Sequence, residues 1–319
     1  MPSATQPAVS IILLNYQNAT DTIACISSLR KIDYDNFNLI IVDNASADDS
    51  VAKIKDFIRS TSAENTFNHL DNDAQLFSEH SAADYTLINS GKNGGFGFGN
   101  NLGIRYALEI AKSDYVLLLN NDTEVKADFL NILVNESLND SAIGIASCRM
   151  YYHDDPQMIW FNGGQYHRCS SKIEHYDFRQ YQPADVENRE ISFITGCLWL
   201  IPRAIIEKVG MLDHSYFMYV EDMEFCHRVT RHGFKLHVTD KTCIWHKVGS
   251  TSAQTSSGFS VYWMARNRIK FIRENVSGLC RWTSLIYSIS YFTLRWAAHR
   301  KFNLMKKHIQ GIFDGFRTV

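Results

Sequence analysis

An apolar run in the sequence LLLNND, residues 117–122, ends directly in two amides and a carboxylate. Oxygen ligands of this kind suit a hard divalent cation, because Mg²⁺ and Mn²⁺ use one or two carboxylates together with substrate phosphates. Asp122 is therefore a candidate metal ligand. The alternative is a turn that caps a helix, since Asn and Asp are common at such positions.

A second apolar segment precedes Glu221 and Asp222, in the sequence FMYVEDMEFCHRV. Met223, Cys226 and Val229 have the spacing of a buried helix face, so we expect a helix to begin at the two acids. A carboxylate at that position can simply stabilise the helix dipole. A partly buried aspartate beside an apolar wall is also typical of a general base.

The third candidate is His246-Lys247, in the sequence CIWHKVGS. His246 can ligate a metal, and Lys247 can neutralise a phosphate group. A single histidine in such a segment is also often a structural residue.

The glycine-rich sequence GKNGGFGFG, residues 91–99, follows a predicted strand and precedes a predicted helix. The pattern GxGxxG of dinucleotide-binding proteins does not fit, because Asn100 or Leu102 occupies the place of its last glycine. This mismatch argues against a nicotinamide-dependent oxidoreductase, but it leaves open that the backbone here contacts a nucleotide.

Four apolar, β-branched runs have the pattern of buried parallel strands, at residues 9–14, 39–42, 85–88 and 115–119. Helical patterns separate these runs, with helix starts expected near Thr20 or Asp21 and after residues 46–49, whereas the polar residues 60–83 indicate a surface excursion. A βαβαβαβ order implies a mostly parallel sheet that binds ligands beyond the carboxyl ends of its strands.

The second half of the sequence is less regular. It contains a predicted strand at 191–201, a short helix from Pro202, and helical patterns at 259–275 and about 281–313. We expect two parts, residues 1–258 as the catalytic domain and 259–319 as a helical region.

The net charge of −2 is unevenly distributed. Residues 266–319 hold eleven Lys and Arg against two acids, a net charge of +9, which leaves −11 for residues 1–265. The seven cysteines form no CxxC pair and the N-terminus lacks a leader pattern, so we expect reduced cysteines and a cytoplasmic protein. Residues 282–294 are too short an uncharged stretch to span a bilayer, which needs about 20 apolar residues.

Taken in order, these motifs resemble those of inverting nucleotide-sugar glycosyltransferases of family 2, which have the GT-A fold. The resemblance rests on residues 9–16, 39–50, 93–104, 117–125, 194–203, 217–229, 246–252 and 262–271. Within that family the sequence is most similar to bacterial rhamnosyltransferase-like enzymes of polysaccharide synthesis, such as those of O-antigen. The implied fold is α/β, a Rossmann-like, mostly parallel central sheet flanked by helices, with a C-terminal helical extension.

The resemblance also assigns roles. It implies that Asp43 accepts a hydrogen bond from a uracil or thymine ring, that Asp122 and His246 bind Mg²⁺ or Mn²⁺, and that Asp222 is the catalytic base with Glu221 beside it. The other residues it places at the nucleotide or donor are Asn15, Asn93, Asn120, Asn121, Gly196, Lys247 and Arg266.

The implied reaction moves a sugar from a nucleotide donor to a hydroxyl of a saccharide or lipid-linked saccharide. Resemblance favours dTDP-rhamnose as the donor, with a UDP-hexose or UDP-galactofuranose as the alternative, because thymine and uracil differ by one methyl group. A second hypothesis is a protein that binds a nucleotide sugar without transferring it. The aromatic residues Trp160, Phe161, Tyr166 and Trp199 could stack on the acceptor sugar or belong to the core.

The basic tail has two open interpretations, and nucleic-acid binding is not among them. Arg266, Lys270 and Arg273 share one helical face, and Leu285, Ile289, Phe292 and Trp296 form an apolar stripe. This pattern is typical of a helix at an anionic membrane surface, which would make the protein peripheral on the inner face of the cell membrane. The alternative is that the stripe packs on the catalytic domain or on a second subunit.

Overall fold

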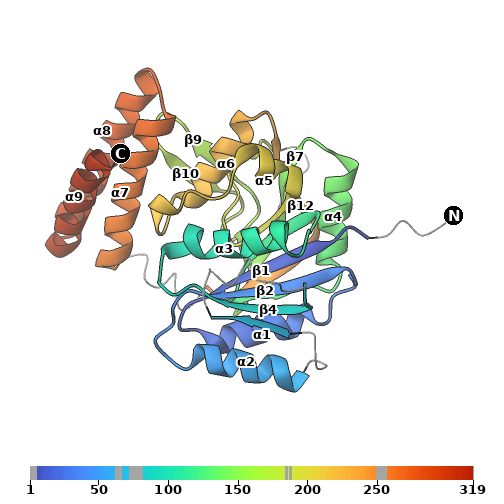
Figure 1. Ribbon diagram of the computed structural model, residues 1–319. Helices are drawn as coiled ribbons and strands as arrows, with labels where there is room; N and C mark the ends of the chain where they lie inside the picture. The colour runs from blue at the N-terminus through green and yellow to red at the C-terminus, as the bar shows by residue number, and fades with distance from the viewer. Residues whose placement is uncertain are drawn as a thin grey trace.

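The structure is a computed structural model that describes residues 6–61, 67–71, 82–183, 186, 189–248 and 257–318. A central sheet lies between two layers of helices, and the last three helices form a separate bundle at one side (Figure 1). The part of residues 246–252 beyond Val248 lies outside the described residues.

The four predicted parallel strands are confirmed, as β1 (Val9–Asn15), β2 (Phe37–Asp43), β4 (Tyr85–Asn89) and β5 (Tyr115–Asn120). They lie in the order β4, β2, β1, β5, with Asn15 opposite Asp43 in the register of β1 and β2. Each of these strands continues one residue beyond its apolar run and ends at a polar residue. The polar ends therefore meet at one edge of the sheet.

Helices α1 (Ala19–Leu29) and α2 (Ser50–Thr61) cover one face of this half of the sheet, and α3 (Gly95–Glu109) covers the other (Figure 1). The predicted cap of the first helix is wrong by two or three residues, because Asn18 occupies that position and accepts a hydrogen bond from the backbone of Asp21. The aspartate instead lies in the first turn, where its charge is favourable.

Two expectations about strands need correction. Part of the predicted surface excursion forms β3 (Phe67–Leu70), which pairs in parallel with β4 and buries Leu70. Its alternation is too short to stand out from the polar sequence around it. The predicted strand at 191–201 is shorter, because only β11 (Leu198–Pro202) is a strand and Phe193 forms a single bridge with Gly164.

The second half extends the same sheet. Beyond β5 come β11, β7, β12 and β6, and β11 is antiparallel to both β5 and β7. The elements of this half are β6 (Thr123–Val125), α4 (Phe129–Asn139), β7 (Ile143–Tyr152), β8 (Ile159–Phe161), β9 (Gly164–His167), β10 (Lys172–His175), α5 (Arg203–Val209), a 3₁₀ turn (His214–Tyr216), α6 (Glu221–Arg231) and β12 (Lys235–His246). The predicted helix starts at Pro202 and Glu221 are confirmed.

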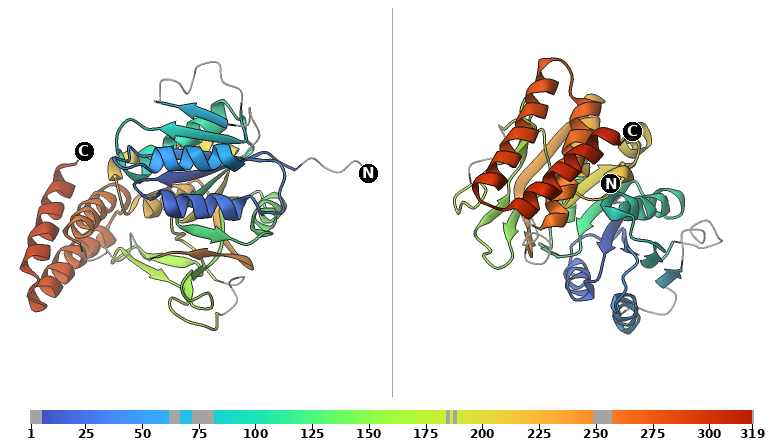
Figure 2. Two further views of the ribbon diagram at one scale, coloured as in Figure 1. Left: turned by 90° about the horizontal axis from the view of Figure 1, so that it is seen from below. Right: turned by 90° about the vertical axis from the view of Figure 1, so that its left-hand side faces the viewer.

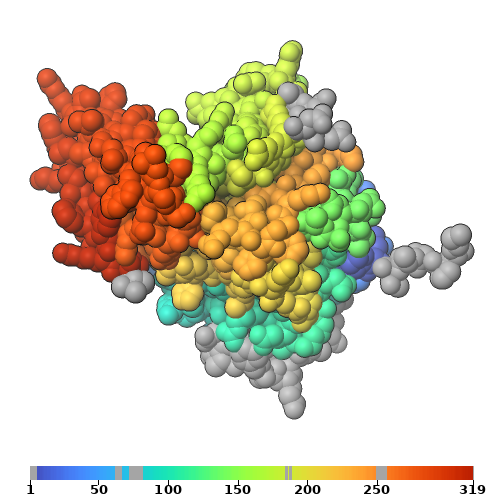
Figure 3. Space-filling view, turned by 90° about the horizontal axis from the view of Figure 1, so that it is seen from above, coloured from blue at the N-terminus to red at the C-terminus, as the bar shows by residue number. Residues whose placement is uncertain are grey.

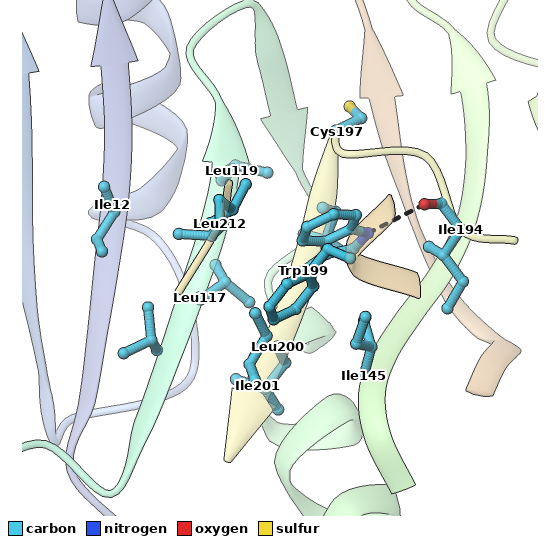
Figure 4. Packing of buried hydrophobic residues seen from close by; sticks show 14 of the residues in the cluster. Ile12, Leu117, Leu119, Ile145, Ile194, Cys197, Trp199, Leu200, Ile201 and Leu212 are labelled. Atoms are coloured by element: carbon cyan, nitrogen blue, oxygen red, sulfur yellow. Dashed lines mark hydrogen bonds between the residues drawn. The ribbon is translucent and has the colours of Figure 1, made fainter. Parts of the chain in front are cut away.

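Trp199 is at the centre of the core between the two halves (Figure 4). It is fully buried, its ring stacks 5.3 Å from that of Phe225, and its Nε1–H donates to the carbonyl oxygen of Ile194 at 3.2 Å. Phe161 is also fully buried. Both residues are therefore part of the core and are not available to stack on an acceptor sugar.

The C-terminal bundle consists of α7 (Gly258–Asn275), α8 (Leu279–Ala298) and α9 (Phe302–Arg317). The single helix predicted at 281–313 is two helices, which turn at Arg300 with a positive φ of 54°. Figure 2 shows the three helices side by side, and in Figure 3 they form a lobe beside the sheet domain. None of the helices in the described ranges is long and apolar enough to cross a membrane.

Two basic residues of the predicted interfacial face, Lys270 and Arg273, make contacts within the protein. Lys270 is buried and forms ion pairs with Asp213 at 3.0 Å and Glu274 at 2.8 Å. Arg273 donates to the carbonyl oxygens of Gly315 and Thr318. These side chains join α7 to the segment before the 3₁₀ turn and to the C-terminal end of α9.

The predicted apolar stripe also points inward. Leu285 belongs to the core, and Phe292 and Trp296 line a cavity between α8 and the other two helices. The expectation that every cysteine is reduced is wrong as well, because Cys169 and Cys280 form a disulfide between the β9–β10 turn and the first turn of α8. Sequence spacing gave no indication of this pair, whose members lie 111 residues apart.

Candidate active site

The carboxyl ends of β1 and β2 bring Asn15 and Asp43 together. Asn15 Nδ2 donates to Asp43 Oδ1 at 2.7 Å, and both side chains are buried. The hydroxyl of Ser46 donates to the same oxygen at 2.6 Å, and the Ser46 backbone N–H donates to Oδ2 at 2.9 Å. A carboxylate has about four acceptor positions, so Asp43 keeps capacity for one further donor.

A hydrogen-bonded chain links this pair to the end of β5. Thr22 Oγ1 donates to Asn15 Oδ1 at 2.8 Å and receives a hydrogen bond of 2.8 Å from Asn121 Nδ2. Thr22 comes from α1 and was not predicted as a site residue, because a threonine inside a helical pattern carries no distinctive sequence signal. The chain fixes the orientation of the Asn15 amide.

Asn93 contacts Asn44, the residue that follows Asp43. Its Oδ1 accepts from Asn44 Nδ2 at 3.0 Å and from the backbone N–H of Gly95 at 3.1 Å. Asn44 was not among the predicted site residues, although it follows Asp43 directly. The arrangement holds the first turn of α3 against the end of β2.

The glycines of residues 91–103 allow close packing of the backbone around α3. Gly95 has a φ of +87°, and a Cβ there would collide with the carbonyl group of Phe217. Phe96 N donates to the same Phe217 oxygen at 2.7 Å. At Gly103 a Cβ would lie 2.6 Å from the Ile12 side chain. The glycine-rich segment therefore begins α3 itself and lets it approach β1 and the segment before α6 closely.

Asp122 and His246 are brought together by the pairing of β6 with the end of β12. Thr123 lies opposite His246 in this antiparallel pair, which places His246 Nε2 3.0 Å from Asp122 Oδ1. Both residues are buried, and the indole ring of Trp160 lies against the imidazole with its centroid 4.2 Å away. The two predicted metal ligands thus form one pair.

The chemistry of this pair fits a divalent cation only in part. It offers one carboxylate and one imidazole, and the buried His246 Nδ1 has no hydrogen-bond partner among the described residues. In the described ranges no cluster of three or more His, Cys, Asp or Glu side chains has the arrangement of a metal site. The pair suits a cation such as Mg²⁺ or Mn²⁺ that takes its remaining ligands from substrate phosphates and water.

Lys247 lies next to this pair. Its backbone N–H donates to the Asp122 carbonyl oxygen at 2.8 Å, and its Nζ forms ion pairs with Glu124 at 3.2 Å and Asp21 at 3.6 Å. The Lys247 ammonium lowers the pKa of Glu124 against the opposing effect of burial. The positive charge is therefore held at the edge of the candidate metal site.

Glu221 and Asp222 occupy the first turn of α6, as predicted. Burial raises the pKa of both carboxyl groups, and the neighbouring Asp222 charge raises that of Glu221 further. Backbone N–H groups of Met223 and Gly196 hydrogen-bond to Asp222 and oppose the rise. Within the part of the chain that the structure describes, the buried Glu221 Oε2 has no hydrogen-bond partner. Asp222 is thus the more readily ionised of the two.

The backbone before these acids is strained. Phe217, Tyr219 and Val220 have positive φ values of 59°, 69° and 74°, and such a conformation is unusual for a β-branched residue. A buried side chain of α7, Asn267, holds the loop by donating from Nδ2 to three carbonyl oxygens. The acceptors are Tyr216 at 2.6 Å, Met218 at 2.8 Å and Tyr219 at 2.8 Å.

Arg266 differs from the expectation of donor binding. Its guanidinium donates to the carbonyl oxygen of Ser215 and to Asn267 Oδ1, and it lies over the ring of Trp263. These contacts support the loop before Glu221. In the described ranges they do not join Arg266 to the residues around Asp43 or Asp122.

Gly196 connects the two groups of acids. A Cβ at this glycine would lie 3.6 Å from Asp222 Cβ and 3.4 Å from the Phe96 ring. The next residue, Cys197, accepts at its carbonyl oxygen a hydrogen bond of 2.8 Å from Asn120 N. The end of β5 and the start of α6 therefore meet at the turn before β11. The residues predicted for the nucleotide, the metal and the base, other than Arg266, thus form one continuous region.

Sequence comparison identifies relatives of the chain. Residues 10–210 match the family described as glycosyl transferase family 2, and residues 115–313 match glycosyl transferase family group 2. The low-salt glycan biosynthesis hexosyltransferase Agl10 of Haloferax volcanii is 28% identical over 251 residues, 76% of each chain. The dTDP-rhamnosyl transferase RfbF of Shigella flexneri is 25% identical over 244 residues, 73% of this chain and 79% of the relative.

Solved structures share the fold. The mannosyltransferase PcManGT of Pyrobaculum calidifontis, in complex with GDP-Man and Mn²⁺, aligns over 99% of this chain and 77% of its own, with a TM-score of 0.58 and 13% identity. GalNAc-T7 with UDP, GalNAc and Mn²⁺ aligns over 85% of this chain and 48% of its own, with a TM-score of 0.62 and 13% identity. The expected GT-A fold is confirmed by these likenesses.

Proposed function

The chain belongs to glycosyl transferase family 2, and from this premise we propose that it transfers a sugar from a nucleotide donor to a hydroxyl acceptor with inversion at the anomeric carbon. The observation that carries the proposal is Asp222, a half-buried carboxylate with a raised pKa at the start of a helix. It lies beside Gly196, in the same region as the candidate nucleotide and metal residues.

We assign the nucleotide base to the region around Asp43. The acceptor capacity that Asn15 and Ser46 leave on this carboxylate suits the ring N–H of uracil or thymine. Burial makes the contact selective, because a ligand without this N–H would leave one acceptor position of the buried carboxylate without a hydrogen bond. Asn93 and Asn121 hold the surrounding loops in place.

Asp122 and His246 would hold Mg²⁺ or Mn²⁺ at the carboxyl end of β5. A bound ion of this kind neutralises the charge that develops on a departing nucleoside diphosphate. Lys247 adds a positive charge at the same edge, where it can attract the donor's phosphates. Asn120 and Asn121 shape the turn that presents Asp122.

Asp222 then accepts the proton of the acceptor hydroxyl as the hydroxyl oxygen bonds to the anomeric carbon and the bond to the diphosphate breaks. A raised pKa suits this role, because an effective base has a pKa near the working pH. Glu221 has the higher pKa of the two, so it stays protonated to a higher pH and leaves the negative charge on Asp222. A single displacement of this type inverts the configuration.

For the donor we propose dTDP-rhamnose, supported by the relative named as a dTDP-rhamnosyl transferase. A UDP-hexose or UDP-galactofuranose is the alternative, because the other relative is named only as a hexosyltransferase. The proposed acceptor is a saccharide or lipid-linked saccharide of a cell-surface polysaccharide, reached from the cytoplasmic side of the membrane. Residues 259–319 would supply the contact with the membrane or with a second subunit.

A donor screen tests the proposal. The purified chain is incubated with dTDP-rhamnose, UDP-hexoses and UDP-galactofuranose, with Mg²⁺ or Mn²⁺, and released nucleoside diphosphate is measured. We expect slow release with one donor, faster release with an acceptor, and an inverted anomeric centre by NMR. Binding of a donor without release under any of these conditions would instead support a nucleotide-sugar-binding protein.

A further inference from the structure

A cavity of about 200 Å³ lies between the three helices of the C-terminal bundle, outside the proposed active site. Its lining includes Val261, Arg268, Phe292, Arg295, Trp296 and His308. Binding sites for drug-sized molecules usually measure about 300–1,000 Å³, so this cavity fits a smaller chemical group. Two arginines in so small a space point to an anion.

Arg268 is the central charge of the cavity. Its guanidinium stacks on Phe292 at 4.7 Å from the ring centre, and burial lowers its pKa from the ordinary value. Lys270, two residues further along α7, forms ion pairs with two carboxylates. In the described parts of the chain, by contrast, no carboxylate lies within ion-pair distance of Arg268. Its charge is half-buried, and no described carboxylate pairs with it.

Among the residues that the structure describes, two further polar groups of the cavity are buried and have no hydrogen-bond partner. They are the Trp296 Nε1–H and His308 Nε2, and the His308 side chain is only 4% exposed. Most buried polar groups in proteins have a hydrogen-bond partner, so two such groups without a partner in one cavity are unusual. The guanidinium of Arg268 and the indole of Trp296 can only donate hydrogen bonds. The missing partner must therefore bring acceptor oxygens.

More positive charge surrounds the same indole. The Arg295 guanidinium and the Lys301 ammonium lie over the Trp296 ring, 5.7 Å and 5.9 Å from its centre. Burial and the nearby Arg268 charge lower the pKa of His308 to about 4, so the imidazole is neutral at pH 7. A compact group with several acceptor oxygens and a negative charge, such as a phosphate, complements the two arginines and the indole N–H, whereas Nε2 of the neutral His308 is itself an acceptor.

The outer face of α8 suggests what carries the phosphate. Leu279, Trp282, Ile286 and Leu294 follow helical spacing, and their exposed fractions are 79%, 64%, 63% and 67%. Both arginines of α8 lie off this face by helical spacing. A long uncharged apolar face with basic residues at its end is typical of a helix that lies at a lipid surface.

We propose that the cavity between α7, α8 and α9 binds the phosphate of an anionic membrane amphiphile, with Arg268, Arg295 and the Trp296 indole around the phosphate and the outer face of α8 against the apolar part of the membrane. The site would hold the catalytic domain beside a lipid-borne acceptor. This proposal does not depend on the donor or on the transfer step, since it concerns residues that take no part in either.

The test uses the purified full chain and two kinds of probe. Flotation measures binding to vesicles of phosphatidylcholine alone and of phosphatidylcholine mixed with phosphatidylglycerol, and calorimetry measures binding of inorganic phosphate and of soluble short-chain phosphatidic acid. We expect binding to the mixed vesicles and to phosphatidic acid. Loss of one charged hydrogen-bond donor should weaken phosphatidic acid binding ~10-fold or more in Arg268→Met.

Two further variants separate the site from general surface charge. Trp296→Phe keeps the ring and removes only the N–H, so it should also weaken phosphatidic acid binding. Lys306→Met removes one exposed charge of α9 outside the cavity and should leave that binding unchanged. Melting curves check folding, and Arg268→Met should fold because it removes a half-buried charge that no described carboxylate pairs with.

The outcomes are distinct. Equal phosphatidic acid affinity in wild type, Arg268→Met and Trp296→Phe would overturn the site. Tight binding of inorganic phosphate without binding to either vesicle would overturn the amphiphile as the source. A third outcome is that the chain binds neither kind of vesicle and forms a dimer in solution. If Ile286→Glu then dissociates this dimer, the outer face of α8 is the contact with a second copy of the chain.

Discussion

The side-chain amide of Asn267 donates a hydrogen bond of 2.8 Å to the carbonyl oxygen of Tyr219, two residues before Glu221. Tyr219 and Val220 both have positive φ, and such conformations cost about 1–3 kcal/mol each unless neighbouring contacts impose them. A helix of the C-terminal region therefore holds the strained loop that delivers the proposed base.

Replacing Asn267 with alanine tests this support. The change leaves carbonyl oxygens of the loop without their donor, so we expect a loss of about 1–3 kcal/mol in unfolding free energy. Turnover should fall while the KM for the donor stays nearly constant, because the loop positions Asp222 and not the nucleotide. Asn275→Ala, which removes a single amide contact to Phe271 at the end of the same helix, is the matched control.

Asp222→Asn should lower turnover by about 10²–10⁴-fold, the usual contribution of a general base. The amide keeps the size of the side chain, so calorimetric affinity for the donor should survive. Glu207→Gln, an exposed acid of α5, controls for the loss of a charge. Near-normal turnover in Asp222→Asn, or a larger loss in Glu221→Gln, would show that the base is assigned to the wrong residue.

The pH dependence of turnover follows from the same group. Burial raises the pKa of Asp222 from its ordinary value of 3.8 to about 6. Only the ionised form accepts a proton, so turnover should rise about tenfold per pH unit below this pKa and level off above it. Initial rates at saturating donor between about pH 5 and pH 8 measure the profile. A profile already flat at the low end would mean that the base has an ordinary pKa.

Glu221 affects stability in the opposite direction to a salt-bridged acid. Its pKa rises from 4.5 to about 8 on folding, so the unfolded chain ionises first as the pH increases. Between these values the folded state binds more protons, and the free energy of unfolding decreases with rising pH. We expect Glu221→Gln to melt at a higher temperature than the wild type at pH 8 and to reduce this decline. Equal melting temperatures across the range would exclude the effect.

The sequence predicted the part of the site that depends on the ends of regular elements. The buried strands before Asp43 and Asp122 and the helix that begins at Glu221 have strong local patterns, and the residues at their ends follow directly. The sheet then brings Asn15 beside Asp43, because parallel neighbours end at the same edge.

Contacts between distant segments could not be predicted in this way. The position of Arg266 beside Ser215, and the disulfide of Cys169 with Cys280, depend on how α7 and α8 pack against the rest of the chain. That Phe292 faces the other helices could not be predicted either, because α8 carries apolar residues on two faces. Which of these two faces is covered depends on the packing of α9.

The last prediction concerns the metal. Asp122 and His246 are the two side chains that we assign to Mg²⁺ or Mn²⁺, so Asp122→Ala should remove most of the gain in donor affinity that the metal gives. Even indirect partners of a metal ligand contribute about 10–100-fold, and a direct ligand should contribute at least as much. Calorimetric titration of the donor with Mn²⁺ and with EDTA measures this gain.

Asp140→Ala is the matched control, because Asp140 is an aspartate whose ion pair with Lys235 lies at the surface. Asp140→Ala should keep the full difference in donor affinity between Mn²⁺ and EDTA. His246→Ala should reduce this difference in the same way as Asp122→Ala. If Asp122→Ala retains the wild-type difference, the metal is held elsewhere. If the wild type itself shows no difference, Lys247 remains as the positive charge available to the diphosphate, and the proposed metal dependence is wrong.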